Sequence, residues 1–279
     1  MADKKIIAVV GATGAQGGGL VRAIVRDKGG AFQVRALTRD INAEKAQALA
    51  KLGVQLVAAD LDDIESLKRA FEGAYGAFAL TNYWEHFSPE KELAQAKAQA
   101  RAAKDVGLQH VIWSTLEDTR QFMPADDKRM PMLQEKYRVP HFDAKAEADA
   151  FFSGVPTTFL LTTFYWDNLY MFGLAPKRGD DGKYSWAFPM GQKLASNIGI
   201  PAPYYHAAEA DEYRGYGFPG ADEMGNMFQY YRDFDKEFFA LRDLNTAKAL
   251  NPALQSFDQF LAKNKDKVKA ATEPAQTPA

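Results

Sequence analysis

The chain has 279 residues, of which 47% are hydrophobic and 25% are charged, and its formal net charge is −2. These values are ordinary for a globular protein, and the near-neutral charge does not favour direct binding of nucleic acid or of an anionic membrane surface. The absence of cysteine excludes disulfides, thiolate metal sites and a cysteine nucleophile. The four histidines lie far apart in the sequence, so we expect no metal site.

Two hydrophobic periods alternate over the first 165 residues. Continuous apolar runs predict buried strands, and runs with helical spacing predict helices, several of them closed by a glycine. The expected elements, in chain order, are a strand at 6–10, a helix around 20–25, a strand at 33–39, a helix at 43–52, a strand at 54–60, a helix at 64–71, a strand at 74–81, a helix at 90–106, a strand at 110–115, a helix at 145–153 and a strand at 157–164. This alternation indicates right-handed βαβ units, so we predict an α/β fold with a doubly wound parallel sheet.

Other parts of the chain break this rhythm. Residues 117–140 contain three prolines and many charges without a period, which predicts a long surface excursion. Aromatic residues gather after about residue 170: residues 215–239 predict a loop that enters an amphipathic helix, and residues 250–265 predict a last helix. We interpret the aromatics of this first helix as a packing face, with a partner-binding face as the alternative. The polar composition of residues 266–279 predicts a disordered tail. We therefore divide the chain into three parts: a first domain at 1–165, a smaller lobe at 166–265 and the tail at 266–279.

The predicted first strand begins within five residues of Met1, which leaves no room for a signal peptide. No apolar stretch approaches the length needed to cross a bilayer. We therefore expect a cytoplasmic protein that does not associate with membranes.

Gly11, Gly14 and Gly17 stand between the first predicted strand and the first predicted helix. In a dinucleotide loop, one glycine permits the tight turn, one lets the backbone approach the pyrophosphate, and one lets the helix pack closely on the strand. The helix N-terminus supplies N–H donors and the positive end of a dipole, and Thr13 and Gln16 could add a hydroxyl and an amide. A glycine-rich turn without a ligand is the alternative. The strand–loop–helix context favours the dinucleotide site.

The ends of the later strands supply further candidates. The second strand ends at Arg39, and a basic residue there suits the 2′-phosphate of NADP(H), although it could also be a solvated charge. Asp60 and Leu61 end the third strand, where they could contact the adenine edge. We expect the residues that end the fourth strand to face the middle of the cofactor at the carboxyl edge of the sheet: Thr81, Asn82, Tyr83 and Trp84.

The chain resembles the NmrA-like branch of the atypical short-chain dehydrogenases in a series of stretches that follow the family's order: GATGAQGG, LTR, TNYWE, VIWSTLED, VPHFDAKAEAD, PTTFLLTTFYWDNL, GFPGADEMGNMF and LNPALQSFDQFL. The resemblance implies a Rossmann-type domain that binds NADP(H), the cofactor that Arg39 already favours over NAD(H), and a smaller C-terminal lobe that forms one wall of a cleft. It implies cofactor contacts from Gly11, Thr13, Gly14, Ala15, Gln16, Arg39, Asp60, Leu61, Thr81, Asn82, Lys145, Tyr165 and Asn168.

One stretch departs from the family pattern. Between 188–201 and 204–220, family members carry a further strand–helix–strand block, and this chain is shorter there by about the size of one βαβ unit, roughly 30 residues. The resemblance therefore implies a shortened C-terminal lobe.

The catalytic pair of short-chain dehydrogenases is also altered. These enzymes use Tyr-x-x-x-Lys, and no tyrosine of this chain is followed by lysine four residues on. His141 stands at the tyrosine position, and Lys145 keeps the position that binds ribose hydroxyls. His141 could act as an acid, because imidazole titrates near neutral pH, or it could only cap or pack the helix. Tyr137 cannot share the helix face because Pro140 intervenes.

Other polar and aromatic residues at strand ends have two interpretations each. Ser114 and Thr115 match the serine position of the dehydrogenases, or they only satisfy backbone groups. An aromatic group could stack on nicotinamide or on a flat substrate, or it could form core: Tyr83, Trp84, Phe164, Tyr165 and Trp166.

Two functions follow from these observations. The first is an NADP(H)-binding, redox-sensing regulator with weak or no catalysis, which would act on a protein partner. The second is an NADPH-dependent oxidoreductase that reduces quinones or similar flat aromatic acceptors.

Overall fold

The computed structural model describes residues 4–124, 126–171, 174–178, 181–187, 204–206 and 208–272. The chain divides into two compact units, the first made of Met1–Pro124 and Pro140–Thr162 and the second of Ala125–Val139 and Thr163–Ala279. The sequence predicts three parts with boundaries at residues 165 and 265, and in the structure the second unit also includes the segment Ala125–Val139. The first unit is therefore discontinuous in sequence.

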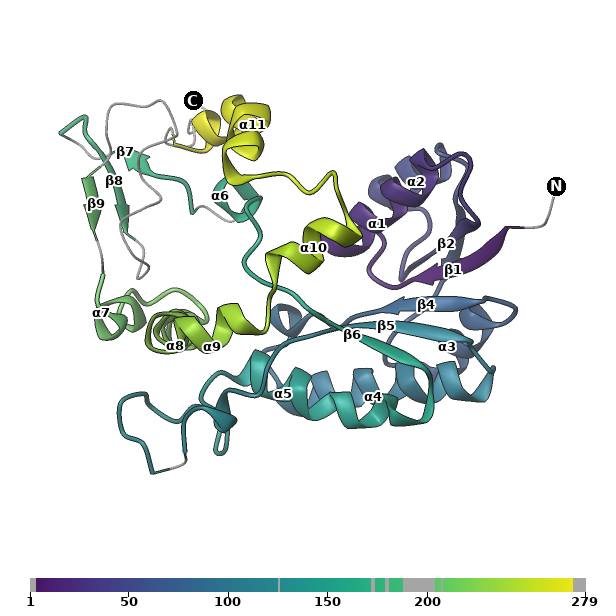
Figure 1. Cartoon of the computed structure of the whole chain (residues 1–279), viewed down its shortest axis with the longest axis horizontal. Coiled ribbons are helices and arrows are strands. Elements are labelled where there is room, and N and C mark those ends of the chain that lie inside the picture. Colours follow the sequence, from purple (N-terminus) through teal and green to yellow (C-terminus); the bar gives the residue numbers. More distant parts are fainter. Residues whose placement is uncertain are drawn as a thin grey trace. The chain divides into compact units, whose positions relative to one another are not determined.

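A parallel sheet of six strands forms the centre of the first unit (Figure 1). Its spatial order is β3-β2-β1-β4-β5-β6, and every pair of neighbours is parallel. The strands are β1 (Lys5–Val9), β2 (Phe32–Thr38), β3 (Gln55–Ala58), β4 (Gly76–Ala79), β5 (His110–Thr115) and β6 (Thr157–Leu161). The order reverses between β1 and β4, which confirms the doubly wound fold and defines a switch point at the carboxyl ends of these two strands.

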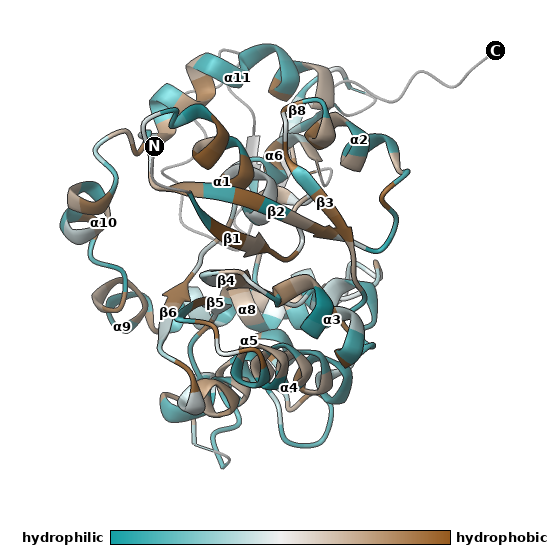
Figure 2. Cartoon of the chain, turned by 90° about the vertical axis from the view of Figure 1, so that its right-hand side faces the viewer, coloured by the Kyte–Doolittle hydropathy of each residue, from teal (hydrophilic) through white to brown (hydrophobic). Residues whose placement is uncertain are grey.

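Helices cover both faces of this sheet, as Figures 1 and 2 show. One face carries α1 (Ala15–Arg26) and α2 (Glu44–Ala50). The other carries α3 (Ile64–Phe71), α4 (Pro89–Asp105) and α5 (Pro140–Ala148), together with the short 3-10 helix η3 (Asp149–Gly154). Two further 3-10 turns, η1 (Tyr83–Glu85) and η2 (Thr119–Gln121), follow the ends of β4 and β5.

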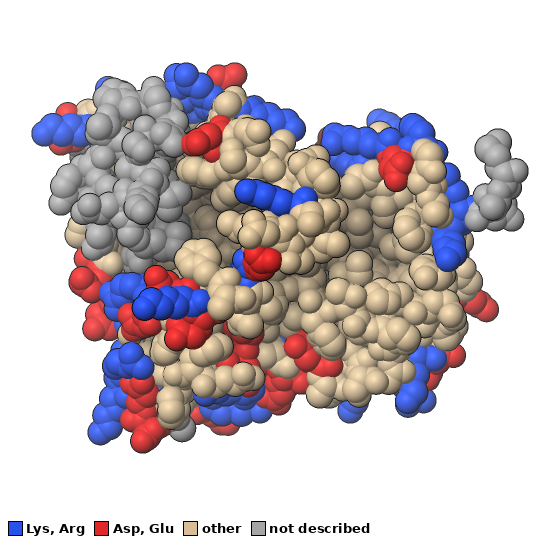
Figure 3. Space-filling model, in the orientation of Figure 1, with Lys and Arg blue, Asp and Glu red and all other residues tan. Residues whose placement is uncertain are grey.

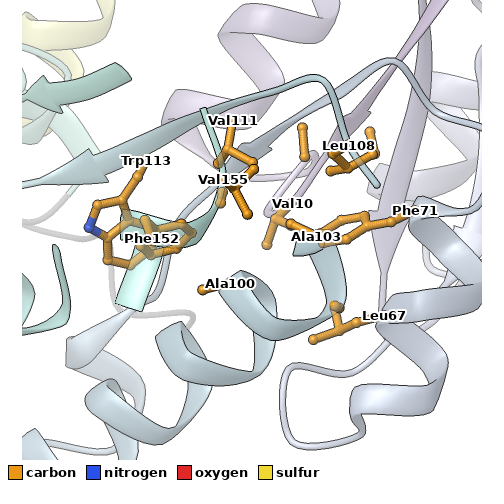
Figure 4. Close-up of a cluster of buried hydrophobic side chains, with 14 of the residues drawn as sticks. Val10, Leu67, Phe71, Ala100, Ala103, Leu108, Val111, Trp113, Phe152 and Val155 are labelled. Carbon is orange, nitrogen blue, oxygen red and sulfur yellow. The ribbon is translucent and has the colours of Figure 1, made fainter. Parts of the chain in front are cut away.

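Neighbouring residues of β1 belong to two different hydrophobic clusters. Val9 packs with residues of α1 and α2, and Ala8 packs with residues of α3 and α4. Successive side chains of a strand point to opposite faces, so a strand with a core on each side reads as a continuous apolar run. Figure 4 shows the larger cluster, in which Trp113 stacks on Phe152 with ring centroids 4.7 Å apart.

Helix α5 begins earlier than the sequence predicts. The apolar pattern predicts a helix at 145–153, but the helix starts at Pro140, and η3 continues it to Gly154. Proline is tolerated at the start of a helix, because the N–H that it lacks has no partner there in any case. His141 therefore lies in the first helical turn and one turn before Lys145.

The second unit contains six helices and a small sheet among the described residues. The helices are α6 (Asn168–Met171), α7 (Ala210–Arg214), α8 (Ala221–Asp233), α9 (Asp235–Ala240), α10 (Leu244–Leu250) and α11 (Phe257–Thr272), and the strands are β7 (Lys177–Arg178), β8 (Tyr184–Ala187) and β9 (Tyr204–His206). Aromatic rings of α8 pack inside this unit, for example Phe228 against Tyr213 at 5.3 Å. This agrees with the packing face expected for α8.

Part of the segment 117–140 is packed, which corrects the predicted surface excursion. Met130 and Tyr137 are buried. Two amide side chains of α8 bind backbone carbonyls of this irregular segment: Asn226 donates to Pro131, at 3.0 Å, and Gln229 donates to Arg129, at 2.8 Å. Because buried backbone groups need hydrogen-bond partners, these amides allow an aperiodic stretch to be buried.

The C-terminal predictions have two outcomes. The predicted tail begins at 266, but α11 runs to Thr272, and Val268 and Thr272 are buried, so the helix extends further than the polar composition suggests. Residues 273–279 lie outside the described residues. The shortening expected near residues 200–204 also falls mainly on residues outside those described.

Substitution of Gly17 tests how tightly α1 packs on β1. A Cβ atom at this position would lie 2.7 Å from the carbonyl carbon of Gly11 and 2.8 Å from the carbonyl oxygen of Val10. We expect Gly17→Ala to lower the free energy of unfolding by about 1–3 kcal/mol, measured by urea denaturation.

Gly19 provides the matched control in the same helix. A Cβ there has no atom within 4 Å, so Gly19→Ala should raise the free energy of unfolding by about 0.5–1 kcal/mol through helix propensity. Equal effects of the two substitutions would contradict the close packing.

Candidate functional site

The glycine loop lies at the switch point and has the geometry of a tight turn. Gly11 has a φ of +62°, a value that favours glycine, and its carbonyl accepts the N–H of Gly14 at 2.9 Å. Gly17 lies so close to the backbone of Gly11 that no side chain fits between α1 and the end of β1. Two of the three glycine roles expected of a dinucleotide loop are therefore present, the tight turn and the close packing.

The N-terminus of α1 is open to an anion. Gly14 is the N-cap and has no side chain to occupy the first N–H groups, and the first turn contains no acidic residue. Gly14 and Ala15 are exposed, and Thr13 is half-buried. The dipole of a twelve-residue helix and its N–H donors therefore face solvent at the switch point.

Ser114 connects this loop to the end of β5. Its hydroxyl donates to the side-chain oxygen of Gln16 at 2.8 Å. The neighbouring Thr115 instead donates to the carboxyl of Asp149, at 2.7 Å, and burial raises the pKa of that carboxyl. Ser114 is thus the one of the two that lies beside the predicted cofactor loop.

Arg39 and Glu85 form an ion pair at the edge of the predicted adenosine site. The guanidinium Nη1 lies 3.1 Å from Glu85 Oε2, and the amide of Asn82 donates to the other carboxylate oxygen at 3.2 Å. Arg39 is therefore paired with a carboxylate of the protein, and it is not only a solvated charge at the end of a strand. Asp60 is exposed, and its carboxylate accepts the N–H of Asp62 at 2.9 Å, while Leu61 packs against the core.

Lys145 is buried in a polar cluster behind the end of β4. Its Nζ donates to the carbonyl of Thr81 at 3.1 Å and to the hydroxyl of Thr81 at 2.7 Å, and it lies 2.9 Å from Glu92 Oε1. The Thr81 hydroxyl in turn donates to Glu92 at 2.5 Å. These three acceptors match the three N–H donors of an ammonium group.

Glu92 is the counterion of this cluster, and its side chain is fully buried. Burial by itself would raise the pKa of the Glu92 carboxyl, but the charge of Lys145, the nearby His86 ring and hydrogen bonds from Thr81 and Lys145 lower that pKa to about 2. His86 Nδ1 accepts the N–H of Ser88 at 3.1 Å, which assigns the proton to Nε2, and Nε2 lies 3.4 Å from Glu92 Oε2. The carboxylate is thus stabilised as the charged form.

His141 is buried in an aromatic environment. Its ring centroid lies 4.8 Å from that of Trp84 and 5.9 Å from that of Tyr83, and Phe142 contacts it edge-on. Tyr83 is buried, whereas Trp84 is 40% exposed. These contacts favour a packing role for His141 over the acid role, which stays a hypothesis.

The remaining predicted residues belong to the second unit. Asn168 begins α6, and its N–H donates to the carbonyl of Tyr165. Trp166 packs on Phe260 at 5.5 Å, and Phe164 packs on Phe228. The predicted aromatic group is therefore divided between the two units, and the half-buried rings of Trp166 and Phe164 pack on aromatic side chains of the second unit.

Glu92, His86 and Glu85 are the residues that the sequence analysis did not anticipate. Glu92 lies in an alanine-rich helix and shares the buried stripe of Ala96 and Ala103. Glu92 lies at helical spacing from these small buried alanines, and this position is the sequence signal that could have indicated its burial. Its partner Lys145 is far away in the sequence, so no local spacing indicates the pair.

On the face shown in Figure 3, acidic and basic side chains mix at the lower left, whereas much of the centre carries neither. Within the described residues, no helix is both long and apolar enough to cross a membrane.

Comparisons with known proteins agree with this fold. The sequence profile of the NmrA-like family matches residues 3–236. The NmrA-like family domain-containing oxidoreductase FrzB of Cladobotryum sp. is 26% identical over 247 residues, which are 83% of this chain and 73% of that protein.

Two solved proteins are similar in structure. NmrA, a negative transcriptional regulator, was solved in complex with NADP; it has a TM-score of 0.55 and 28% identity, and the match covers 74% of this chain and 59% of that chain. A form in complex with NAD has the same TM-score. This chain thus spans less than two thirds of NmrA. The triphenylmethane reductase of Citrobacter sp., complexed with NADP(H), has a TM-score of 0.65 over 95% of this chain and 99% of its own, but its identity of 18% indicates the fold alone.

Substitution of Glu92 tests the buried cluster. Glu92→Gln removes the counterion of a buried ammonium, so we expect the free energy of unfolding to fall by about 3–5 kcal/mol. Glu90→Gln is the matched control, because Glu90 is exposed in the first turn of the same helix, and it should cost less than about 1 kcal/mol. Urea denaturation at neutral pH measures both.

The pH dependence gives an independent prediction. Since folding lowers the pKa of Glu92 from 4.5 to about 2, its contribution to stability is complete above about pH 4.5 and is lost as the pH falls towards 2. The stability difference between the unsubstituted chain and Glu92→Gln should therefore shrink by up to about 3 kcal/mol across this range. A difference that stayed constant would contradict the charged assignment.

Proposed function

Because this chain belongs to the NmrA-like family, we propose that its first unit binds NADP(H) or NAD(H) and that the chain is a redox-sensing regulator with weak or no catalysis. The observation that carries the binding proposal is the combination of an uncapped, exposed N-terminus of α1 with a Gly17 that admits no side chain. NmrA, at 28% identity a regulator solved with NADP, supports the same reading.

The residues of the first unit fit a dinucleotide in three groups. The glycine loop would hold the pyrophosphate, Arg39 with Asp60 and Leu61 the adenosine, and the end of β4 the nicotinamide side. The full set that we propose within the first unit is Gly11, Thr13, Gly14, Ala15, Gln16, Gly17, Arg39, Asp60, Leu61, Thr81, Asn82, Tyr83 and Lys145. Tyr165 and Asn168, which the family resemblance adds, belong to the second unit and stay predictions from the sequence. A bound nicotinamide would supply hydride chemistry.

The proposed weakness of catalysis rests on Lys145. In short-chain dehydrogenases the equivalent lysine holds the ribose, but here its three N–H donors are committed to Thr81 and Glu92. A ribose hydroxyl would have to displace one of these acceptors from a buried cation. His141 stands in place of the tyrosine and is packed among aromatic rings, an environment that favours a packing role over proton donation.

NADP(H) is the preferred cofactor in this proposal, because Arg39 is a cation that follows β2. The proposal also includes a cytoplasmic location and a protein partner, whose contact with this chain would depend on cofactor occupancy.

An NADPH-dependent oxidoreductase that acts on quinones or similar flat acceptors is the second candidate. The observation that favours it is the exposed ring of Trp84 beside His141, because a flat acceptor could stack there. The naming of the Cladobotryum relative as an oxidoreductase supports it too.

A charge placed at the N-terminus of α1 tests the binding site. Ala15→Asp puts a carboxylate in the first turn, where it favours the helix dipole but repels a pyrophosphate. We expect the substitution to leave the thermal unfolding midpoint unchanged or higher and to weaken NADPH binding at least about tenfold, equivalent to 1.4 kcal/mol. Ala15→Asn, similar in shape and neutral, should bind nearly normally. Equal binding by both variants would contradict a phosphate site at this helix.

An assay of turnover separates the two functions. NADPH should bind, as followed by its fluorescence, while its oxidation in the presence of a panel of quinones stays near the protein-free rate. Sustained turnover would favour the oxidoreductase, and its loss in His141→Ala would then assign the acid role to His141. Turnover that survives this substitution would exclude that role.

A further inference from the structure

We infer that Glu85 sets the discrimination between NADP(H) and NAD(H), by holding Arg39 in an ion pair that a 2′-phosphate must open. This inference rests on the proposed function, namely that the first unit binds a nicotinamide dinucleotide. It adds a specificity-determining residue that belongs to neither the glycine loop nor the end of β2.

The contact between the two side chains is bidentate. Arg39 Nη1 lies 3.1 Å from one carboxylate oxygen of Glu85, and Nη2 donates to the other at 3.4 Å. The amide of Asn82 also donates to Glu85, at 3.2 Å, and so orients the carboxylate from its own loop. The fork of a guanidinium matches a phosphate in the same way as a carboxylate, so Glu85 occupies the face of Arg39 that a phosphate would use.

The strand order places this pair across the proposed cofactor site. Arg39 follows β2, and Glu85 ends η1, which follows β4. Strand β1 lies between β2 and β4 in the sheet, and the glycine loop continues directly from it. The ion pair thus connects the two strand ends on either side of the loop that would hold the pyrophosphate.

The two cofactors differ in what they offer to this pair. The 2′-phosphate of NADP(H) carries negative charge and would bind Arg39 only after the ion pair between Arg39 and Glu85 breaks. The 2′-hydroxyl of NAD(H) carries no charge, and it can donate to a carboxylate, as it does in many NAD-binding sites. Glu85 therefore lowers the affinity for NADP(H) without lowering the affinity for NAD(H).

The ion pair between Arg39 and Glu85 is exposed, and it is therefore weak enough for a phosphate to displace Glu85. The side chain of Arg39 is 69% exposed and that of Glu85 is 50% exposed. Ion pairs between such exposed groups contribute little to stability, because water and salt screen them. A phosphate can therefore displace Glu85, and the cost of this displacement lowers the affinity for NADP(H) by a modest factor.

Dissociation constants for NADP⁺ and NAD⁺ test the inference, measured by calorimetry on the full chain and on Glu85→Gln, Arg39→Ala and the double variant. We expect Glu85→Gln to tighten NADP⁺ binding about 2- to 5-fold, in line with the small free energy of an exposed pair. NAD⁺ binding should stay within about twofold or weaken, because a neutral amide is a poorer acceptor than a carboxylate. The gain for NADP⁺ should disappear when Arg39 is alanine, since Glu85 acts through Arg39.

Glu72→Gln is the control for net charge. Glu72 caps the C-terminal end of α3, just before β4 begins, and so it lies at the opposite edge of the sheet from the strand ends. This substitution removes the same charge and should leave both dissociation constants unchanged.

Two results would overturn the inference. One is a ratio of the NADP⁺ and NAD⁺ constants that Glu85→Gln leaves within about twofold of its original value, below the effect expected of an exposed pair. The other is a gain for NADP⁺ that persists in the Arg39→Ala background, which would mean that Glu85 acts without Arg39. Failure of the unsubstituted chain to bind either nucleotide is a different result, because it would reject the proposed function itself.

Discussion

The buried ammonium of Lys145 joins three parts of the first unit that are separate in sequence. It belongs to α5, its counterion Glu92 belongs to α4, and its remaining acceptors belong to Thr81, where the chain leaves β4. A buried charge is costly unless every donor finds a partner, so these three elements are held at fixed distances from one another. The loop that carries Trp84 and Glu85 starts from this fixed point, and His141 lies one turn away from it on α5. The carboxyl edge of the sheet, where we propose that the cofactor binds, therefore depends on the buried contacts of Lys145 with Glu92 and Thr81.

The predictable part of the structure is the part in which the signal is local. Alternating apolar runs identify all six strands of the sheet, and helix α3 has the predicted limits, because its buried residues recur with the helical period. The glycine loop is equally local, since turn, close approach and helix start lie within a few residues. Glu92 and Glu85 are different: each depends on a partner elsewhere in the chain, and a carboxylate on a helix or in a loop usually faces solvent.

The surface excursion predicted for residues 117–140 is wrong in part, for another reason. Its irregular backbone has no period, and burial of such backbone depends on side chains that satisfy its carbonyls. Asn226 and Gln229 supply them from α8. Nothing local in the sequence of α8 indicates these acceptors, because they lie 95 and 100 residues earlier in the chain.

This interleaving of the two units has a consequence for the order in which the chain can fold during synthesis. The strands of the first sheet are complete once Leu161 has emerged, whereas the amides of α8 that bind the segment 126–139 emerge later. Domains fold as units as the chain leaves the ribosome, N-terminal parts first. The carbonyls of this segment are therefore synthesised before the α8 amides that bind them, so these hydrogen bonds form only after α8 has emerged.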